Sequence, residues 1–110
     1  MPSEIQNIIK FWPESRSKIL SGEKKQTTRW GERFFSLGQE LDAFINTENQ
    51  PFAKLKVNHI EKRTLVTMSV EDIQENGYAS REDFWHGFQK SFPEALPTEE
   101  FTLVKFEIVK

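Results

Sequence analysis

The sequence lacks several residue types and patterns that point to particular functions. It has no cysteine and only two histidines among 110 residues. The chain therefore has no disulfide, thiol nucleophile or thiolate metal ligand, and His59 and His86 are too far apart in sequence to indicate a metal site. No apolar run approaches the ~20 residues of a membrane-spanning helix, and the first residues lack the pattern of a signal peptide. We expect a cytoplasmic protein that binds no metal, no cofactor and no membrane.

Positive charge is not in excess either. Lys and Arg number 15 against 17 Asp and Glu, which gives a formal net charge of -2. Such a chain lacks the overall positive field that draws proteins to polyanions, so any contact with nucleic acid must be local. Aromatic residues are plentiful by contrast, with ten Phe and three Trp. This composition predicts one globular domain over residues 1–110 with a single aromatic-rich core, and we expect a monomer.

Apolar spacing and turn residues predict a mixed order of strands and helices. Strands are expected over residues 6–12, 25–30, 41–45, 52–67 and 101–109, and helices over 13–21, 70–76 and 81–92. The stretch 52–67 is either two strands or one strand bent by a bulge near His59 to Arg63. This order indicates the α+β class.

Short polar motifs mark the ends of the predicted helices. Ser69 and Ser80 are each followed three residues later by an aspartate, which is typical of a helix N-terminus. Gly22 and the pair Asn76-Gly77 suit helix C-termini, where a left-handed residue often ends the helix. Glu75 then lies in the last turn of its helix, where the helix dipole disfavours a carboxylate. This position mildly favours a special role for Glu75.

Side chains able to act on a substrate concentrate between Ser21 and Trp30. Gly22 ends the first helix, and a polar strand follows it. Because side chains alternate across a strand, residues 25, 27 and 29 should share one face, and the even-numbered residues the other. On pattern alone, such a strand is more often a solvated edge or a phosphate-contacting strip than a catalytic centre.

Five segments of the chain carry a resemblance to a known family. They are the pattern Gly22-x-Lys24-x-x-Thr27-x-Arg29, the turn Leu37-Gly38-Gln39-Glu40, the run from Ile73 to Tyr78, the expected helix that contains Phe84, and the terminal strand from Leu103 to Phe106. In this order they are similar to the ASCH domain of the PUA-like superfamily. The resemblance implies a small, mixed, mostly antiparallel PUA-like β-barrel flanked by about three helices.

Within that family the chain resembles the small bacterial amidohydrolases that remove the acetyl group from N(4)-acetylcytidine. The resemblance implies that the catalytic lysine, threonine and glutamate fall on Lys24, Thr27 and Glu75. Thr27 is then the nucleophile or orients a water, and Lys24 activates it. Glu75 carries protons or orients the lysine.

Three further residues near this strand are expected to bind the substrate. Arg29 is the candidate for holding the substrate or the oxyanion, with Lys25 and Trp30 beside it. The chain departs from the family in having Lys25 after the motif lysine, where threonine is common, and in a longer segment 31–51. Both differences bear on the shape of the pocket and on the substrate.

Two points of physical chemistry bear on Lys24. A lysine with an unperturbed pKa of ~10.4 is neutral in only about one molecule in 2,500 at pH 7, so a useful base needs a pKa lower by roughly three. Positions 24 and 27 lie on opposite faces of a regular strand, so the roles that the resemblance implies require Lys24 to sit in the turn after Gly22, outside the strand. The sequence leaves open whether Lys24 or Glu75 is the general base.

Three functions are compatible with these residues. The leading hypothesis is an amidohydrolase acting on an acylated cytosine nucleoside, because a lysine, a threonine and a glutamate supply an activated nucleophile, charge stabilisation and a proton. The second is a module that grips an RNA nucleotide without chemistry. The third is a domain that binds a protein partner.

Overall fold

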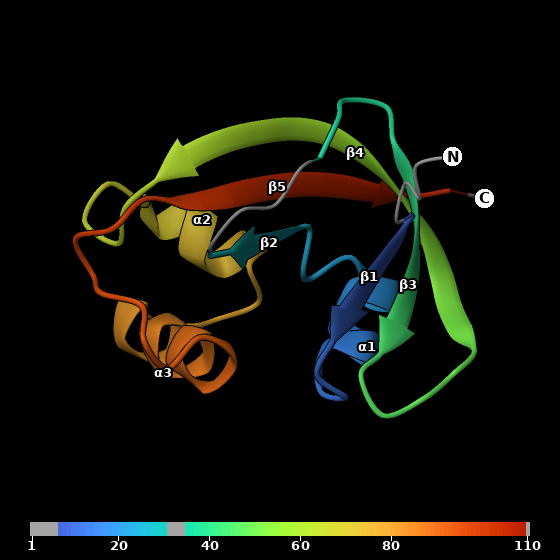
Figure 1. Cartoon of the computed structure of the whole chain (residues 1–110), viewed down its shortest axis with the longest axis horizontal. Helices are drawn as coiled ribbons and strands as arrows, with labels where there is room; N and C mark the ends of the chain where they lie inside the picture. Colours follow the sequence, from blue (N-terminus) through green and yellow to red (C-terminus); the bar gives the residue numbers. More distant parts are fainter. Residues whose placement is uncertain (1–6, 31–34, 110) are drawn as a thin grey trace.

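The fold is of the mixed α+β class, as the sequence predicts. A computed structural model places residues 7–30 and 35–109; the expected strand start at residue 6 and the part of segment 31–51 at 31–34 lie outside the described residues. The elements are β1 (Ile8–Phe11), α1 (Ser15–Ser21), β2 (Gln26–Arg29), β3 (Glu40–Ile45), β4 (Pro51–Arg63), α2 (Val70–Glu75), α3 (Arg81–Ser91) and β5 (Phe101–Ile108) (Figure 1).

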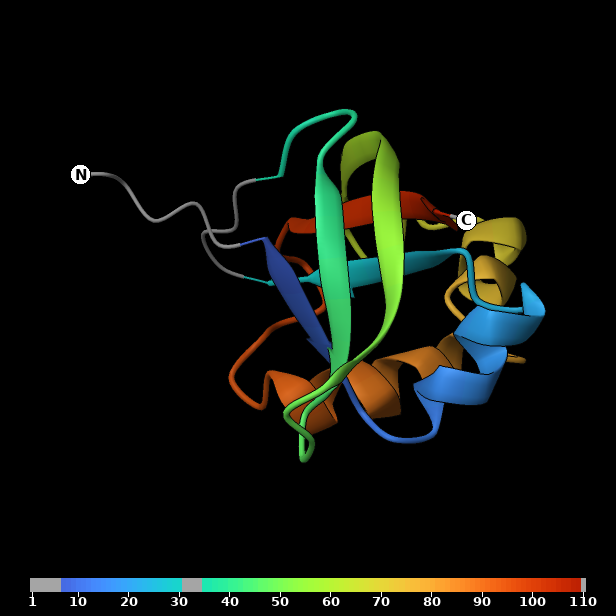
Figure 2. The same ribbon diagram turned by 90° about the vertical axis from the view of Figure 1, so that its right-hand side faces the viewer.

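The five strands form one sheet in the order β1-β3-β4-β5-β2. β1 runs parallel to β3, and the other neighbouring pairs are antiparallel. The sheet is strongly coiled, so that β3 and β4 cross β2 and β5 steeply in Figure 2. Among the described residues β1 and β2 do not pair, so the expected closed barrel is not confirmed. A side chain links these two edges instead, because the guanidinium of Arg29 in β2 donates to the carbonyl of Lys10 in β1 at 3.0 Å.

The described residues form two apolar clusters, which corrects the expectation of a single core. β5 is buried on both faces and contributes to each cluster in alternation. Val104 and Phe106 join the first cluster, with β1, β3, β4 and Ile19 of α1. Phe101 and Leu103 join the second, which packs against α2 and α3. The site described below lies where these two halves of the molecule meet β2.

The helix that leads into β2 ends as predicted but begins later. α1 starts at Ser15, and Pro13 lies in the turn before it, where the backbone N–H of Ser15 donates to the carbonyl of Trp12. Gly22 ends the helix with a φ of 86°, a left-handed conformation that favours glycine. The chain leaves this glycine and enters β2 within four residues.

Both ends of α2 carry well-defined caps. Ser69 and Asp72 form a complete capping box, in which each side chain accepts from the other residue's backbone N–H. At the other end the N–H of Gly77 donates to the carbonyl of Gln74, and the N–H of Tyr78 donates to that of Ile73. These two bonds, with the left-handed Gly77, make a Schellman motif.

The long strand β4 is a single strand with an irregularity. Its pairing with β5 shifts register between Val57 and His59, close to the expected bulge. It ends at Arg63, earlier than predicted, because Thr64 and Thr67 close a turn through backbone and hydroxyl hydrogen bonds. Val66 therefore lies in that turn and is 79% exposed.

Candidate functional site

A cavity of about 270 Å³ lies between β2, the end of β1 and α3. We call it the main cavity. Its wall includes Trp12, Lys24, Thr27, Arg29, Tyr78 and Phe88. A second hollow of about 260 Å³, the side cavity, adjoins it and shares Lys24, Asn76, Tyr78 and Gly87 with it. The main cavity thus combines an amine, hydroxyls and a guanidinium with aromatic walls, as small-molecule sites commonly do.

Lys24 lies outside the regular strand, as the motif requires. Lys24 lies two residues before β2 begins. Its backbone N–H donates to the carbonyl of Lys18. Its side chain is buried, and its amine nitrogen donates to the carbonyl oxygen of Asn76 at 2.6 Å. Burial, together with the charges of Arg29 and Lys18, lowers the pKa of Lys24 to about 7. About half of the molecules then carry a neutral amine at pH 7, which meets the condition for a lysine base.

Thr27 and Arg29 lie on one face of β2, as strand alternation predicts. Both line the main cavity, and Thr27 is buried. The guanidinium of Arg29 lies 5.1 Å from the ring centroid of Phe11, besides its bond to Lys10. These contacts hold Arg29 in the cavity wall, close enough to Lys24 to affect its pKa.

The opposite face of β2 binds α2 and the second cluster. The hydroxyl of Thr28, a residue that also lines the main cavity, donates to the side-chain oxygen of Asn76 at 3.0 Å. The amide of Gln26 donates to the carboxylate of Glu75 at 3.0 Å. Trp30 packs against Phe92, with ring centroids 6.1 Å apart. It lines neither cavity, so its expected role in substrate binding gains no support.

Lys25 also faces away from both cavities. Its side chain is exposed, and its backbone forms the contacts instead. The N–H of Lys25 donates to the carbonyl of Glu75 at 2.7 Å, and its carbonyl accepts from Phe106. Lys25 therefore ties β2 to α2 and β5, while its amine is not placed to bind a ligand in either cavity.

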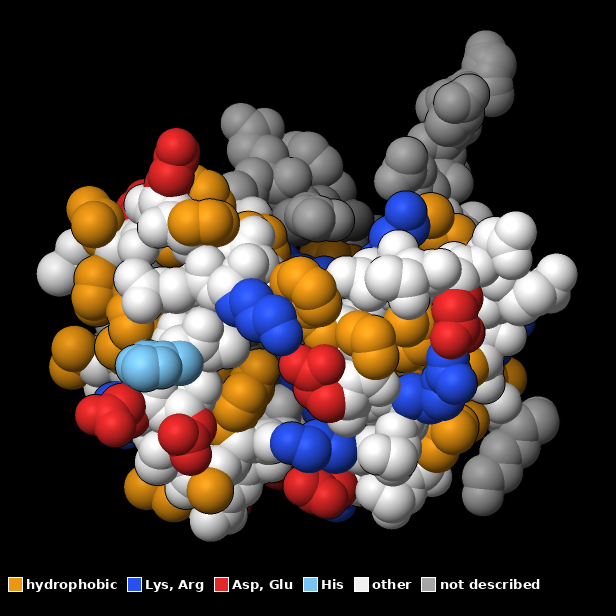
Figure 3. Space-filling model, turned by 90° about the horizontal axis from the view of Figure 1, so that it is seen from below, with side chains coloured by type: hydrophobic (Ala, Val, Ile, Leu, Met, Phe, Trp, Pro, Cys, Tyr) orange, Lys and Arg blue, Asp and Glu red, His pale blue; other side chains and the backbone are white. Residues whose placement is uncertain are grey.

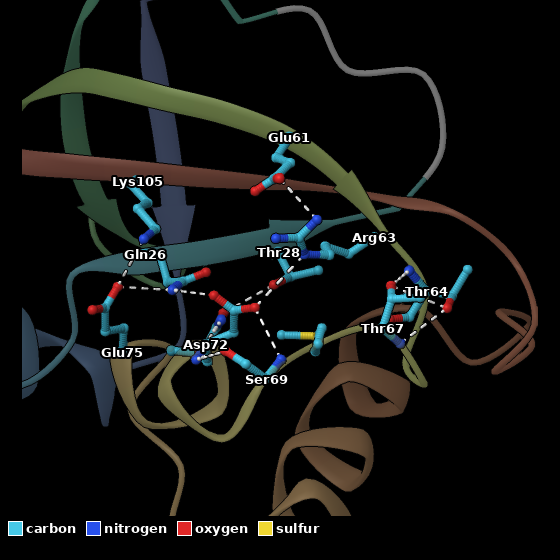
Figure 4. Close-up of polar contacts among 12 residues, drawn as sticks. Gln26, Thr28, Glu61, Arg63, Thr64, Thr67, Ser69, Asp72, Glu75 and Lys105 are labelled. Carbon is cyan, nitrogen blue, oxygen red and sulfur yellow. Dashed lines mark hydrogen bonds and ion pairs between the residues drawn. The ribbon is translucent and has the colours of Figure 1, made fainter.

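The structure does not bring the Glu75 carboxylate to the cavities. It accepts from Gln26 and lies 3.4 Å from the amine of Lys105, as Figure 4 shows. Among the described residues no hydrogen bond or ion pair joins it to Lys24, and Glu75 lines neither cavity. Of the three residues that the resemblance brings together, Lys24 and Thr27 share the main cavity. The role of Glu75 stays a prediction.

A polar network on the side of β2 away from the main cavity holds the N-terminal turn of α2 in place. Asp72 accepts from Ser69 in the capping box and lies 3.7 Å from Arg63 and 3.5 Å from the amide nitrogen of Gln26 (Figure 4). Burial raises the pKa of Asp72, but the hydrogen bonds from Ser69 and Gln26 and the charge of Arg63 outweigh it, so the pKa is lowered overall. The helix anchored in this way presents the carbonyl of Asn76, at its C-terminal end, to Lys24.

The sequence reasoning missed three residues of the site. Tyr78 lies beside Lys24, whose amine nitrogen is 5.8 Å from its ring centroid. Lys18 donates to the carbonyl of Gly77 at 2.7 Å and lies 5.7 Å from the same ring. Gly87 lines both cavities from the middle of α3. A glycine inside a helical pattern signals a close contact or a function, and this signal was present in the sequence.

Two searches of the described residues gave negative results. No group of three or more His, Cys, Asp or Glu side chains is arranged to hold a metal ion in ranges 7–30 and 35–109. None of the helices in that part of the chain has the length and apolar content needed to cross a membrane.

Comparisons with known proteins agree with this fold. Similar crystal structures include a protein of Enterococcus faecalis, with a TM-score of 0.74 and 16% identity over 97% of this chain and 82% of that one. An ASCH domain from Lactobacillus crispatus has a TM-score of 0.70 and 15% identity over 86% and 70% of the two chains. ASCH from Zymomonas mobilis has a TM-score of 0.68 and 15% identity over 94% and 69%. At these identities the likeness concerns the fold.

The sequence itself gives the family. A comparison with curated proteins finds no match. The family model of the ASCH domain, however, matches residues 9–110, which is nearly the whole chain. The segments that first suggested this family, from Gly22 to Phe106, all lie within the matched range. The chain therefore belongs to the ASCH domain family.

Proposed function

We propose that this protein is a cytoplasmic, monomeric amidohydrolase that removes the acyl group from an acylated cytosine nucleoside such as N(4)-acetylcytidine. The observation that carries the proposal is the buried Lys24, whose pKa of about 7 makes it a base near neutral pH. Its amine lies in the wall of a cavity that also contains Thr27 and Arg29. A base, a hydroxyl and a cation are the groups that hydrolysis of an amide requires.

The reaction begins with the neutral amine of Lys24. It takes a proton from a water molecule that the Thr27 hydroxyl orients, and the water oxygen forms a bond to the acyl carbon. The electron pair of the carbonyl double bond moves to the carbonyl oxygen, and Arg29 favours this negative charge. When the tetrahedral intermediate collapses, the carbon–nitrogen bond breaks, and the leaving nitrogen takes the proton from Lys24. The products are the carboxylic acid and the free cytosine amine.

The positions of Lys24 and Glu75 favour the lysine as the general base. The Glu75 carboxylate is engaged by Gln26 and Lys105, whereas the Lys24 amine lies in the cavity wall. In this proposal Glu75 acts from behind β2, since Gln26 and the backbone of Lys25 connect it to the strand. It supports the position of the catalytic strand and touches no substrate.

The size and surroundings of the cavity favour a small ligand. A volume of about 270 Å³ is close to the lower end of ligand pockets, which hold about 300 to 1,000 Å³. On the face that Figure 3 shows, Lys and Arg side chains lie among Asp and Glu side chains, without a broad basic surface. A nucleoside fits such a site better than a long RNA, which needs an extended basic groove.

Incubation with N(4)-acetylcytidine tests the proposal, with release of cytidine followed by chromatography. We expect the wild-type protein to release cytidine and Lys24→Ala to lose at least about 100-fold in kcat. Lys25→Ala is the matched control, because it removes the neighbouring amine, which lies outside both cavities. A wild-type protein that leaves N(4)-acetylcytidine intact contradicts the proposal.

One observation favours a second candidate function, the binding of an RNA nucleotide without chemistry. The side chains around the main cavity include the cations Lys10, Arg29 and Lys90 besides Lys24, and no carboxylate within residues 7–30 and 35–109 lines it. An anionic ligand such as cytidine 5′-monophosphate suits this lining. Binding to long RNA should nevertheless be weak and strongly salt-dependent, because the net charge of the chain is -2. Tight RNA binding that survives high salt, without hydrolysis of N(4)-acetylcytidine, favours this candidate.

A further inference from the structure

We propose that Tyr78 is a further catalytic residue of this site, whose hydroxyl donates a hydrogen bond to the acyl carbonyl oxygen as that oxygen becomes an oxyanion. The inference rests on the proposed function and adds a hydroxyl donor at the oxyanion to the charge of Arg29. Hydrolysis of an amide needs hydrogen-bond donors at the developing oxyanion. Glu75 lies outside both cavities, whereas Tyr78 lines both of them, with its ring centroid 5.8 Å from the amine nitrogen of Lys24.

The backbone position of Tyr78 is fixed by the end of α2. Its N–H donates to the carbonyl of Ile73 at 3.2 Å, which is one of the two bonds of the Schellman motif. The ring packs edge-on against Phe84, with centroids 5.7 Å apart and planes at 81°. Lys18 and Lys24 approach the ring with their amines. Such constraints prevent the side chain from leaving the cavity wall, and preorganised donors are the effective ones in catalysis.

A glycine in α3 makes room for the hydroxyl. A Cβ atom at Gly87 would lie 2.3 Å from the hydroxyl oxygen of Tyr78, far inside normal contact. Glycine within a helix destabilises it by about 1 kcal/mol relative to alanine. The close contact between Gly87 and Tyr78 explains why this position in α3 is nevertheless a glycine. Both residues line the main and the side cavity, so the hydroxyl lies at the boundary between the two.

The protonation state of Tyr78 suits a donor. Burial, together with the charge of Glu14, raises the pKa of Tyr78 above its ordinary value of 10. The phenol therefore keeps its proton through the pH range in which Lys24 becomes neutral. During the reaction Tyr78 retains this proton, and only its hydrogen bond to the carbonyl oxygen strengthens. The single proton that moves passes from water to Lys24 and then to the leaving nitrogen.

Tyr78→Phe tests the inference, because it removes the hydroxyl and keeps the ring. Removing one donor from an oxyanion site costs about 100- to 1,000-fold in kcat, so we expect a loss in that range with a KM close to that of the wild type. The thermal unfolding midpoint should stay near the wild-type value, since the ring contacts remain. Lys25→Ala in parallel shows what a change outside both cavities does.

Gly87→Ala gives a second, independent variant. It keeps the hydroxyl but displaces it together with the ring, because the new Cβ would lie 2.8 Å from Cζ and 2.9 Å from Cε1 of Tyr78, so we expect a loss in kcat in the otherwise intact protein. Turnover that survives in Tyr78→Phe within about threefold of the wild type overturns the inference and leaves the proposed function standing. A wild-type protein that shows no turnover overturns both.

Discussion

The amine nitrogen of Lys24 lies 2.6 Å from the carbonyl oxygen of Asn76, the residue that caps the C-terminus of α2. A helix C-terminus favours a cation, so this contact by itself stabilises the protonated lysine. Burial acts in the opposite direction and is the largest influence on the pKa of Lys24, followed by the charges of Arg29 and Lys18. The site thus holds its lysine firmly in position while binding the proton weakly.

The first prediction concerns the pH dependence of turnover. If Lys24 is the base, kcat/KM should rise with pH up to about 7 and then level off, because the free enzyme gains its neutral amine over that range. Lys24→Arg should abolish the activity, since a guanidinium keeps its proton at any accessible pH. Steady-state rates between pH 5 and 9 check this. A rise centred several pH units lower indicates a carboxylate base.

The second prediction concerns stability. The folded-state pKa of Lys24, about 7, lies below its unfolded value, so the unfolded chain binds more protons between about pH 7 and 10.4. Burial of Lys24 therefore destabilises the fold most below pH 7, and this cost disappears as the pH rises through the window. Lys24→Met should raise the free energy of unfolding at pH 6 and have a smaller effect at pH 9.5. Urea unfolding at the two pH values measures the difference.

The opposite outcome has a clear meaning. If Lys24→Met lowers the free energy of unfolding equally at both pH values, the bond from Lys24 to Asn76 outweighs the cost of burial. Lys25→Met is the matched control, because it changes an exposed lysine of the same segment and should show no such pH dependence.

The third prediction concerns the capping box of α2. Ser69→Ala should cost about 1 kcal/mol of stability at pH 7, as the loss of an N-cap generally does. The lowered pKa of Asp72 means that its carboxylate stabilises the fold above the unfolded value of about 3.9, and that this contribution is lost as the pH falls through the folded value.

Ser80→Ala provides the comparison for this prediction. Ser80 caps α3 by accepting from the N–H of Asp83, without the reciprocal bond that completes the box in α2. We expect the effect of Ser69→Ala to shrink as the pH falls below about 3.9 and through the lowered pKa of Asp72, and that of Ser80→Ala to change less. Equal changes in both variants contradict a special contribution from Asp72. Urea unfolding of the two variants and the wild type at each pH measures these changes in the free energy of unfolding.

Local patterns in the sequence predicted much of the fold because they act over a few residues. Gly22 ends α1 and Gly77 follows the cap of α2 through the left-handed conformation that glycine allows. The four-residue spacing of Phe84 and Phe88 placed both on the buried face of α3. The roles that the resemblance implies for positions 24 and 27, together with strand alternation, require a turn at position 24, and Lys24 does precede β2.

Features that depend on distant parts of the chain were not predictable in this way. Whether β1 meets β2 depends on the coiling of the whole sheet, and Arg29 bridges these edges in place of strand pairing. Apolar residues on both faces of β5 are typical of a central strand, but they do not show that each face packs into a separate cluster. The direction of the Glu75 carboxylate depends on Gln26 and Lys105, which are far from it in the sequence.

The last prediction concerns Glu75, where the resemblance and the geometry lead to different results. A catalytic carboxylate predicts that Glu75→Gln loses most of the turnover. Its observed contacts predict a loss within about tenfold, because glutamine keeps an oxygen for the amide of Gln26 and gives up an exposed ion pair with Lys105, worth at most about 1 kcal/mol.

Three variants measured together separate the two roles. Lys24→Ala should lose the base, while Glu75→Gln and Lys105→Met, which remove the two partners of one ion pair, should have similar and small effects on kcat/KM. Each variant should unfold cooperatively near the wild-type midpoint, so that activity is compared between folded proteins. If Glu75→Gln falls to the level of Lys24→Ala while Lys105→Met stays active, the carboxylate reaches the reacting atoms during turnover. Glu75 must then turn away from Gln26 and into the main cavity when the substrate binds.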